Sequence, residues 1–532
     1  MSAPRLRERY DWVVLGDSAG ALLSACLAAR LGQSVIVVPL VAGARTSRSA
    51  SGQVIDPETN AVYGLREGET AGDAALGGLL ARSFDHLGLQ SEEWRQMELG
   101  GAVPQVVGPS RRVVFWPRNE NLKAELSREF GETGQDSGLM GAVERFESVS
   151  NQYWQDYPEF LSLTEKEKIA KRPVPPLPRS LSGGLDSLIQ EFSRSVEKQA
   201  ATTEKLWLSP RGGLTQIAGK LDDRSWQELG AGVWNSVSGQ ELEAPAGAEL
   251  LQMIALARSA ARVKGGMTAY RLLLASIARR LGAHVLTNEC RRIFIENGKF
   301  VGAQAAGIPS MIAGRAGAID VPLIRVKDRI EFSGKHKSHD LSGSSPVTGW
   351  RFTVALTVSS DAMIPGTGNR VIWQESAAPA VEFEWADPLE YSITEKGQRL
   401  LFLRTTLPFQ ESTLALEFLR MTAARMLRQA SEVFPFLETH LIRIFPDFRA
   451  DTNDFEAMYR FSKLDEIPYN LLRFGGAGLG SRSGIEGLML VSDESFPRLG
   501  QFGGTVAAVE SVAWLAQASG ISGPMAVSHS VV

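Results

Sequence analysis

The stretch WVVLGDSAGALLSACLAARLGQSVIVVPL, residues 12–40, has the pattern of a strand, a glycine turn, a helix and a second strand. Two short runs rich in β-branched residues, WVVL and SVIVV, predict the strands. The small-residue segment between them predicts a helix that ends at Gly32 and packs closely on a sheet. This order is typical of the first βαβ unit of a dinucleotide-binding fold.

The turn GDSAGA, residues 16–21, departs from the usual GxGxxG pattern. Gly16 holds the first glycine position, Ser18 replaces the second glycine, and Ala21 replaces the third, directly after Gly20. The second glycine normally lets the backbone approach a pyrophosphate, so we expect the Ser18 side chain to point to where phosphate oxygens would lie. The helix N-terminus still offers N–H groups and the positive end of a dipole. We therefore expect weakened binding of a dinucleotide rather than its loss.

The second strand also departs from the pattern. It ends in Pro39, where an acidic residue usually accepts hydrogen bonds from the adenosine ribose. Proline has neither a carboxylate nor an N–H group. The ribose contact is therefore lost or is supplied by another part of the chain.

The bulk composition excludes several classes of protein. The net charge of −4 gives no electrostatic basis for binding nucleic acid. Two cysteines, Cys26 and Cys290, cannot form a disulfide framework, and we expect both to serve packing in a reducing, cytoplasmic environment. We see no secretory signal and expect no membrane span. His336 and His339 are the one close histidine pair, and their polar surroundings predict a solvated loop, so we expect no metal site.

The chain is too long for one compact core. Segments with α/β patterns alternate with less regular, proline-rich stretches. We predict an α/β fold in which residues 1–85, 255–330 and 470–532 form a discontinuous Rossmann-like FAD/NAD(P)-binding domain. An inserted α+β domain, residues 86–254 and 331–469, would bind a substrate or a partner.

An apolar stripe at helical spacing runs through residues 143–161. It consists of Val143, Phe146, Tyr153, Tyr157 and Phe160. Such a stripe can line an apolar substrate cavity, but packing of a helix on its own core is the favoured interpretation.

The order of motifs resembles the flavoprotein superfamily of phytoene desaturases, protoporphyrinogen oxidases and amine oxidases, and most closely its phytoene-desaturase branch. The blocks that carry the resemblance are GARTS at 43–47, KGGM at 264–267, CRRI at 290–293 with the following ENGK hairpin, and SD at 492–493 followed by FGGT at 502–505. The Asn-Gly pair in ENGK is itself a specific hairpin signal.

The resemblance implies an FAD site and a role for particular residues. Arg45 would neutralise the diphosphate, the backbone of Cys290 would face the adenine, and Asp493 would bind the ribityl or pyrophosphate part. Gly503 and Gly504 would open a helix that faces the flavin ring. Two roles have alternatives, because Arg45 also fits an exposed loop and Asp493 a turn or helix cap. The remaining candidate cofactor-binding residues are Gly16, Ser18, Gly20 and Ala21, and no catalytic side chain is identified.

The resemblance leaves three functions open. The leading one is an FAD-dependent oxidoreductase that transfers hydride from an apolar, isoprenoid-like or amine substrate to flavin. The second is a non-catalytic binding or accessory protein on a decayed flavoprotein fold, as in Rab GDP-dissociation inhibitors. The third is a protein that binds NAD(P), with Arg45 or Arg48 near the 2′-phosphate.

Four departures favour the second function, because Ser18, Pro39, Ala44 and Ser492 each replace a residue that the FAD site normally uses. The expected partner is accordingly an apolar small molecule or a protein. Peripheral contact with a membrane surface stays open.

Overall fold

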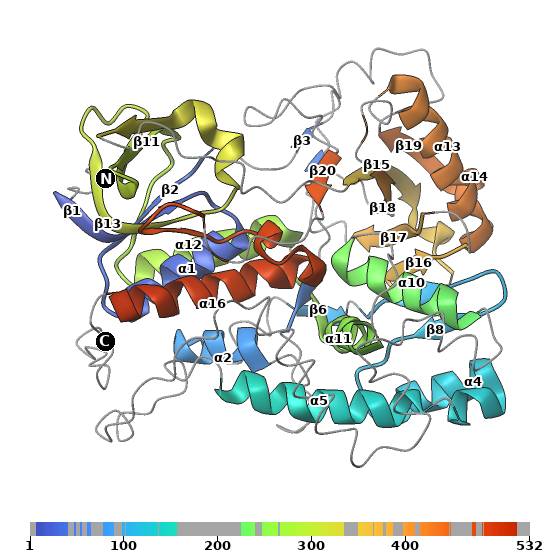
Figure 1. Ribbon diagram of the computed structural model, residues 1–532. Helices are drawn as coiled ribbons and strands as arrows, with labels where there is room; N and C mark the ends of the chain where they lie inside the picture. Colours follow the sequence, from blue (N-terminus) through green and yellow to red (C-terminus); the bar gives the residue numbers. More distant parts are fainter. Residues whose placement is uncertain are drawn as a thin grey trace.

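The computed structural model describes most of the chain between residues 7 and 518. The described range excludes 41–46, 49–53, 56–60, 65–77, 90–97, 102, 137, 157–224, 240–246, 264–265, 335–348, 365–366, 376–378, 387–396, 409, 411–414, 446, 448–470, 475–480 and 482. Within it, two large sheets lie apart from each other, and helices pack against both of them (Figure 1). The predicted α/β fold class is confirmed, whereas the exact division into domains stays a prediction.

The first sheet has the strand order β10-β2-β1-β13-β12-β11-β14, with β21 paired to β13. Its strands are β1 (Arg9–Leu15), β2 (Val35–Val38), β10 (His284–Val285), β11 (Cys290–Glu296), β12 (Lys299–Ala305), β13 (Ile312–Ile319), β14 (Ile330–Ser333) and β21 (Leu488–Leu490). Its four-strand core, β10-β2-β1-β13, is parallel, so the carboxyl ends of these strands share one edge. Such an edge is the usual place for a ligand in this kind of sheet.

Three helices cover one face of the first sheet. They are α1 (Ala19–Arg30), α12 (Gly266–Arg280) and α16 (Gln501–Ala518), and α1 lies beside both of the others (Figure 1). Helix α1 is buried almost all round because its small side chains allow close packing on three sides. The predicted hairpin between β11 and β12 is confirmed, with φ of +51° at Asn297 and +81° at Gly298.

The second sheet has the strand order β19-β15-β18-β17-β16-β7-β8, with β20 paired to β15. Its strands are β7 (Gln105–Val107), β8 (Arg112–Val114), β15 (Gly349–Ser359), β16 (Arg370–Trp373), β17 (Val381–Ala386), β18 (Gln398–Pro408), β19 (Leu441–Phe445) and β20 (Leu471–Phe474). Helices α13 (Leu416–Val433) and α14 (Leu437–His440) cover its outer face (Figure 1). An apolar core that includes Phe383, Trp385 and Phe434 fills this layer.

A middle layer joins the two sheets. Its strands are β5 (Ala61–Tyr63), β6 (Glu98–Gly101) and β9 (Ala260–Val263), and its helices are α10 (Ser225–Ser238) and α11 (Gly247–Arg258). Helices α2 (Gly78–His86), α4 (Asn119–Asp136) and α5 (Leu139–Asp156) lie along the lower edge of Figure 1, and β3 (Ser47–Arg48) forms a separate short pair with β4 (Val54–Ile55). On α5, Val143 and Phe146 are buried in the core, which confirms packing as the role of this part of the apolar stripe. The side chains of Tyr153, Tyr157 and Phe160 lie outside the described residues, as do His336 and His339.

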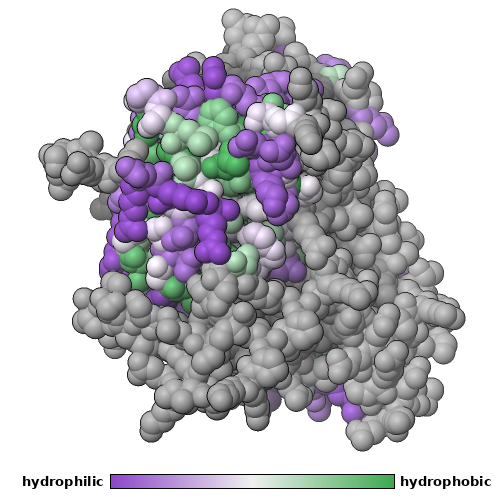
Figure 2. All heavy atoms as spheres, turned by 60° about the vertical axis from the view of Figure 1, so that its left-hand side comes forward, coloured by the Kyte–Doolittle hydropathy of each residue, from purple (hydrophilic) through white to green (hydrophobic). Residues whose placement is uncertain are grey.

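The described surface is mixed in character. On the face turned forward in Figure 2, a compact group of hydrophobic residues is bordered by hydrophilic ones. Among the helices that the structure describes, none has both the length and the hydropathy that crossing a bilayer requires.

Candidate functional site

The strand register brings three chain segments together at the carboxyl edge of the first sheet. Leu15, the last residue of β1, pairs with Val38 of β2 on one side and with Ile319 of β13 on the other. The residues that follow these three positions are Gly16, Pro39 and Asp320. The glycine turn, the strand end that lacks its acid, and a buried aspartate therefore meet at one edge.

Ser18 is the N-cap residue of α1. Its φ of −62° and ψ of 162° are extended, and its Oγ accepts a hydrogen bond of 3.2 Å from the Ala21 N–H. The Ser18 hydroxyl is therefore directed at its own helix and stabilises the first turn, instead of pointing to the position of a phosphate. Ala21 is fully buried and packs in the core.

The carboxylate of Asp320 is bound by the N–H groups of the turn. Its Oδ2 accepts hydrogen bonds of 2.9 Å from the Ser18 N–H and 3.1 Å from the Asp17 N–H. Its own N–H donates to the Leu15 carbonyl over 3.0 Å, and only 3% of the residue is exposed. A carboxylate at a helix N-terminus is stabilised by the helix dipole and by charge-assisted hydrogen bonds. Asp320 thus places a carboxylate of the chain itself on two N–H groups of the glycine turn.

Gly16 is required by this arrangement. Its φ is +122°, which L side chains rarely adopt, and a Cβ at this position would lie 2.0–2.2 Å from the three carboxylate atoms of Asp320. The glycine that indicated a dinucleotide turn therefore makes room for the Asp320 side chain.

The other candidate glycines serve close backbone packing. A Cβ at Gly20 would lie 2.8 Å from the Gly504 carbonyl oxygen, so α1 and α16 approach each other at their N-terminal ends. A Cβ at Gly503 would lie 2.5 Å from the Phe496 carbonyl oxygen, and one at Gly504 would lie 2.4 Å from Oδ1 of Asp493. The structure therefore brings Asp493 to the start of α16.

Ser492 and Asp493 open a short 3-10 helix, η7 (Asp493–Ser495). The Ser492 Oγ accepts a hydrogen bond of 3.2 Å from the Glu494 N–H, and the Ser495 hydroxyl accepts one of 3.3 Å from the Ser492 N–H. This reciprocal pair is a capping box. Ser492, which stands where the resemblance expects glycine, thus has a local structural role.

The adenine end of the expected site is closed by backbone and arginine contacts. The Cys290 N–H donates to the Pro39 carbonyl over 2.7 Å. The Arg329 Nη1 donates to the carbonyl oxygens of Cys290 and Leu40, both over 2.6 Å, and its Nη2 lies 2.9 Å from Oε1 of Glu289. Both backbone polar groups of Cys290, which the resemblance assigns to adenine, are therefore bound within the chain.

Both cysteines behave as packing residues. Burial raises the pKa of the Cys290 thiol to about 12, although nearby Arg329 acts in the opposite direction. Burial likewise raises the pKa of the Cys26 thiol, whose Sγ donates to the Leu274 carbonyl over 3.2 Å. Neutral, buried thiols are poor nucleophiles, which agrees with a packing role.

A cavity lies where the N-termini of α1 and α16 meet. Its volume is about 30 Å³, and its lining residues are Ser18, Ala19, Val62, Tyr63, Met267, Tyr270, Asp493, Gln501, Phe502 and Thr505. Polar and apolar side chains thus line a space that is large enough for about one water-sized group.

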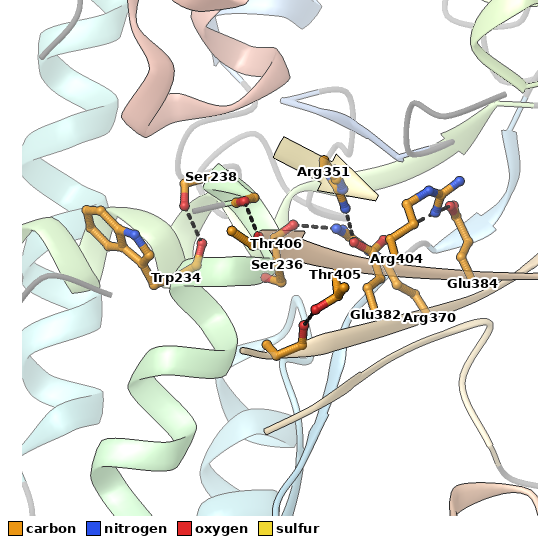
Figure 3. A network of polar contacts seen from close by, with 12 residues as sticks. Trp234, Ser236, Ser238, Arg351, Arg370, Glu382, Glu384, Arg404, Thr405 and Thr406 are labelled. Carbon is orange, nitrogen blue, oxygen red and sulfur yellow. Dashed lines mark hydrogen bonds and ion pairs between the residues drawn. The ribbon is translucent and has the colours of Figure 1, made fainter. Parts of the chain in front are cut away.

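The inner face of the second sheet carries a buried network of charges. Figure 3 shows the guanidinium groups of Arg351, Arg370 and Arg404 gathered around the carboxylates of Glu382 and Glu384. Arg370 Nε lies 2.9 Å from Oε1 of Glu382, and all of these side chains except Arg351 are at most 2% exposed. The network is therefore an integral part of the interior.

The charged network is linked to the cavity through Tyr63. Arg370 donates through Nη1 to the Tyr63 hydroxyl over 2.7 Å and through Nη2 to the Ser236 carbonyl, and the Tyr63 hydroxyl itself donates to that carbonyl over 2.8 Å. Burial alone would raise the pKa of Glu382, but attraction from Arg370, Arg351 and Arg404 outweighs it and lowers the pKa to about 2. Among the described residues, the inner face of the second sheet thus presents fixed charges.

The described residues do not fit a dinucleotide held in the usual way. The Asp17 and Ser18 N–H groups of the turn bind Asp320, and the backbone groups of Cys290 that the resemblance assigns to adenine bind Pro39 and Arg329. Arg45, the expected diphosphate partner, lies outside the described residues.

Sequence reasoning missed Asp320 and Arg329. A signal for Asp320 exists in the segment AGAID, where an acid directly follows a buried parallel strand. Side chains at that position gather at the ligand edge of the sheet. For Arg329 the sequence offers no comparable signal, because its partners lie 39 to 289 residues away.

Comparisons with known proteins support the fold. No family model and no curated protein matches the chain. Among solved structures, an oxidoreductase from Methanosarcina mazei is 15% identical, with a TM-score of 0.53, and the match covers 95% of this chain and 100% of that chain. Wild-type putrescine oxidase bound to putrescine is 13% identical, with a TM-score of 0.50, over 96% and 99% of the two chains. Identities this low show a shared fold, so the chain has the Rossmann-like α/β fold of these oxidoreductases.

Proposed function

We propose that this chain is a non-catalytic binding protein that has the fold of oxidoreductases and binds no dinucleotide cofactor. The observation that carries the proposal is the Asp320 carboxylate on the Ser18 and Asp17 N–H groups. Both donors belong to the glycine turn at a helix N-terminus, which is where a dinucleotide-binding fold binds a pyrophosphate.

The energy of this arrangement disfavours a second anion. A phosphate oxygen brought to about 4 Å from the Asp320 carboxylate would be repelled by about 4 kcal/mol at the effective dielectric constant of partly buried sites. This repulsion corresponds to roughly a thousandfold loss of affinity. The phosphate would in addition lack the two N–H donors that Asp320 uses.

The cavity between α1, α12 and α16 is the binding site that we propose. Its lining combines Met267 and Phe502 with the phenol groups of Tyr63 and Tyr270. The carboxylate of Asp493 is directed at the start of α16, where the helix dipole stabilises it. Because the cavity has a volume of about 30 Å³, the ligand that we propose would insert only one small group there.

The test begins with the protein as purified without added cofactor. We expect no visible flavin absorbance and no flavin released on denaturation. Titration calorimetry with FAD and with NADP should show no saturable binding. The variant Ser18→Gly restores the expected glycine but leaves Asp320 in place, so it should also bind no FAD. Stoichiometric flavin in the wild-type protein would refute the proposal, and flavin binding by Ser18→Gly alone would show that the serine is the obstacle.

An FAD-dependent oxidoreductase is the second candidate. It is supported by the shared fold and by the position of the cavity at the N-termini of two helices, Ala19–Arg30 and Gln501–Ala518. Bound flavin would supply a two-electron acceptor for an isoprenoid-like or amine substrate. A yellow protein that an anaerobic reductant bleaches would favour this candidate over the binding protein.

A further inference from the structure

One ten-residue segment, residues 320–329, starts at the carboxyl edge of the first sheet. It begins directly after β13, includes the 3-10 helix η2 (Leu323–Arg329) and leads directly into β14. Its two ends carry the residues that close the expected dinucleotide site, Asp320 at the glycine turn and Arg329 at Cys290. Asp320 and Arg329 therefore belong to one continuous segment, residues 320–329, which we call the edge segment.

The edge segment is fixed along its length. Val321, Leu323 and Val326 are at most 6% exposed and pack in the core beneath the sheet edge. Between them, Arg325 forms an ion pair with Glu494 of η7, and both side chains are largely buried. The segment therefore has an apolar anchor and charged contacts at the turn, at η7 and at Cys290.

The chemistry of the two ends matches the two ends of an ADP group. At the glycine turn, an anionic oxygen of Asp320 accepts from backbone N–H groups, as a phosphate oxygen would. At the other end, Arg329 donates an N–H to the Cys290 carbonyl, and the exocyclic amine of adenine is also an N–H donor. The Pro39 carbonyl meanwhile accepts from the Cys290 N–H.

We propose that the edge segment permanently occupies the position of the ADP half of a dinucleotide, with Asp320 in place of the diphosphate and Arg329 at the adenine end. This inference rests on the proposed function, which it deepens. Because the occupant is tethered to the site, it competes with a free ligand at a very high effective concentration. The turn itself keeps its N–H donors and helix dipole, so removal of the occupant should expose an anion site.

The test uses the full chain and two probes, inorganic diphosphate and ADP, in titration calorimetry. Asp320→Ala should bind diphosphate at least about tenfold more tightly than the wild type, a difference of about 1.4 kcal/mol. In this variant ADP should bind no better than diphosphate, because Arg329 still closes the adenine end. In the double variant Asp320→Ala/Arg329→Ala, ADP should bind more tightly than diphosphate. The matched control is Asp328→Ala, which removes an exposed acid from the same segment and should leave binding unchanged.

A second measurement applies if the Asp320→Ala variant does not fold. If that variant unfolds in plain buffer, diphosphate or formate should restore the folded state, because either anion can take the place of the lost carboxylate. Asp320→Asn keeps an oxygen available to the turn N–H groups but removes the charge, so it should fold and gain less diphosphate affinity than Asp320→Ala. Failure of every anion to bind or to restore folding would overturn the inference, as would equal gains in Asp320→Ala and Asp328→Ala. Flavin in the wild-type protein would instead refute the proposed function, so the two failures are distinguishable.

Discussion

The substitution Glu382→Gln tests whether the charged network holds the second sheet against the middle layer. Glu382 accepts from Arg370 and Arg351 and lies 3.6 Å from Arg404 Nη1, and its side chain is 1% exposed. Glutamine has nearly the same shape but carries no charge. The variant therefore leaves Arg351 and Arg370 without their ion-pair partner, while the packing is kept and Arg404 retains Glu384.

The expected loss of stability follows from two independent routes. Lowering the pKa of Glu382 from 4.5 to about 2 corresponds to about 3 kcal/mol of preferential stabilisation of the charged form. Removal of one partner from a buried ion pair costs about 3–5 kcal/mol. We therefore expect Glu382→Gln to lower the free energy of unfolding by about 3 kcal/mol at pH 7.

The assay is urea unfolding followed by tryptophan fluorescence at several pH values. Because the pKa of Glu382 is lowered in the folded state, its contribution is fully present above the unfolded pKa and is lost as the pH falls toward 2. The difference between wild type and variant should therefore shrink between pH 4.5 and about 2. The exposed, neighbouring Glu375→Gln serves as the control. A change within about 0.5 kcal/mol at pH 7, the range of surface substitutions, would refute the reasoning.

Three further predictions follow from single sites. Gly16→Ala should destabilise the protein by more than the roughly 1–2 kcal/mol of its backbone strain, because the new Cβ displaces the carboxylate of Asp320. The melting temperature should recover in part in the double variant Gly16→Ala/Asp320→Ala, and no recovery would contradict the clash. Arg258→Met should lower the free energy of unfolding in urea by about 3–5 kcal/mol. The Arg258 side chain is 4% exposed, forms a buried ion pair with Glu147 and also donates to backbone carbonyl groups. A decrease below about 1 kcal/mol would argue against that role. Cys26 and Cys290 should resist iodoacetamide at pH 8 in the native state and react in urea, because burial keeps both thiols protonated. Mass spectrometry measures the labelling, and rapid labelling of either thiol in the native protein would contradict its burial.

The fold was predictable because its signals are local. The alternation of strand, turn and small-residue helix in residues 12–40, and the Asn-Gly hairpin at 297–298, depend on neighbouring residues alone. The burial of Cys26 was predictable for the same reason, since it lies on a helix of small residues. The proximity of Gly16, Pro39 and Asp320 follows from strand register, which periodicity does not specify between distant strands.

By itself, the amino-acid sequence determined that a glycine turn and a helix N-terminus stand at the edge of a parallel sheet, and that Ser18 and Pro39 depart from the dinucleotide pattern. Only the tertiary structure decided what occupies that turn. Asp320 is separated from Ser18 by 302 residues, and Arg329 from Leu40 by 289. Whether such side chains reach a binding turn depends on the pairing of β1 with β13 and on the packing of the edge segment, and these long-range contacts leave no periodic trace in the sequence.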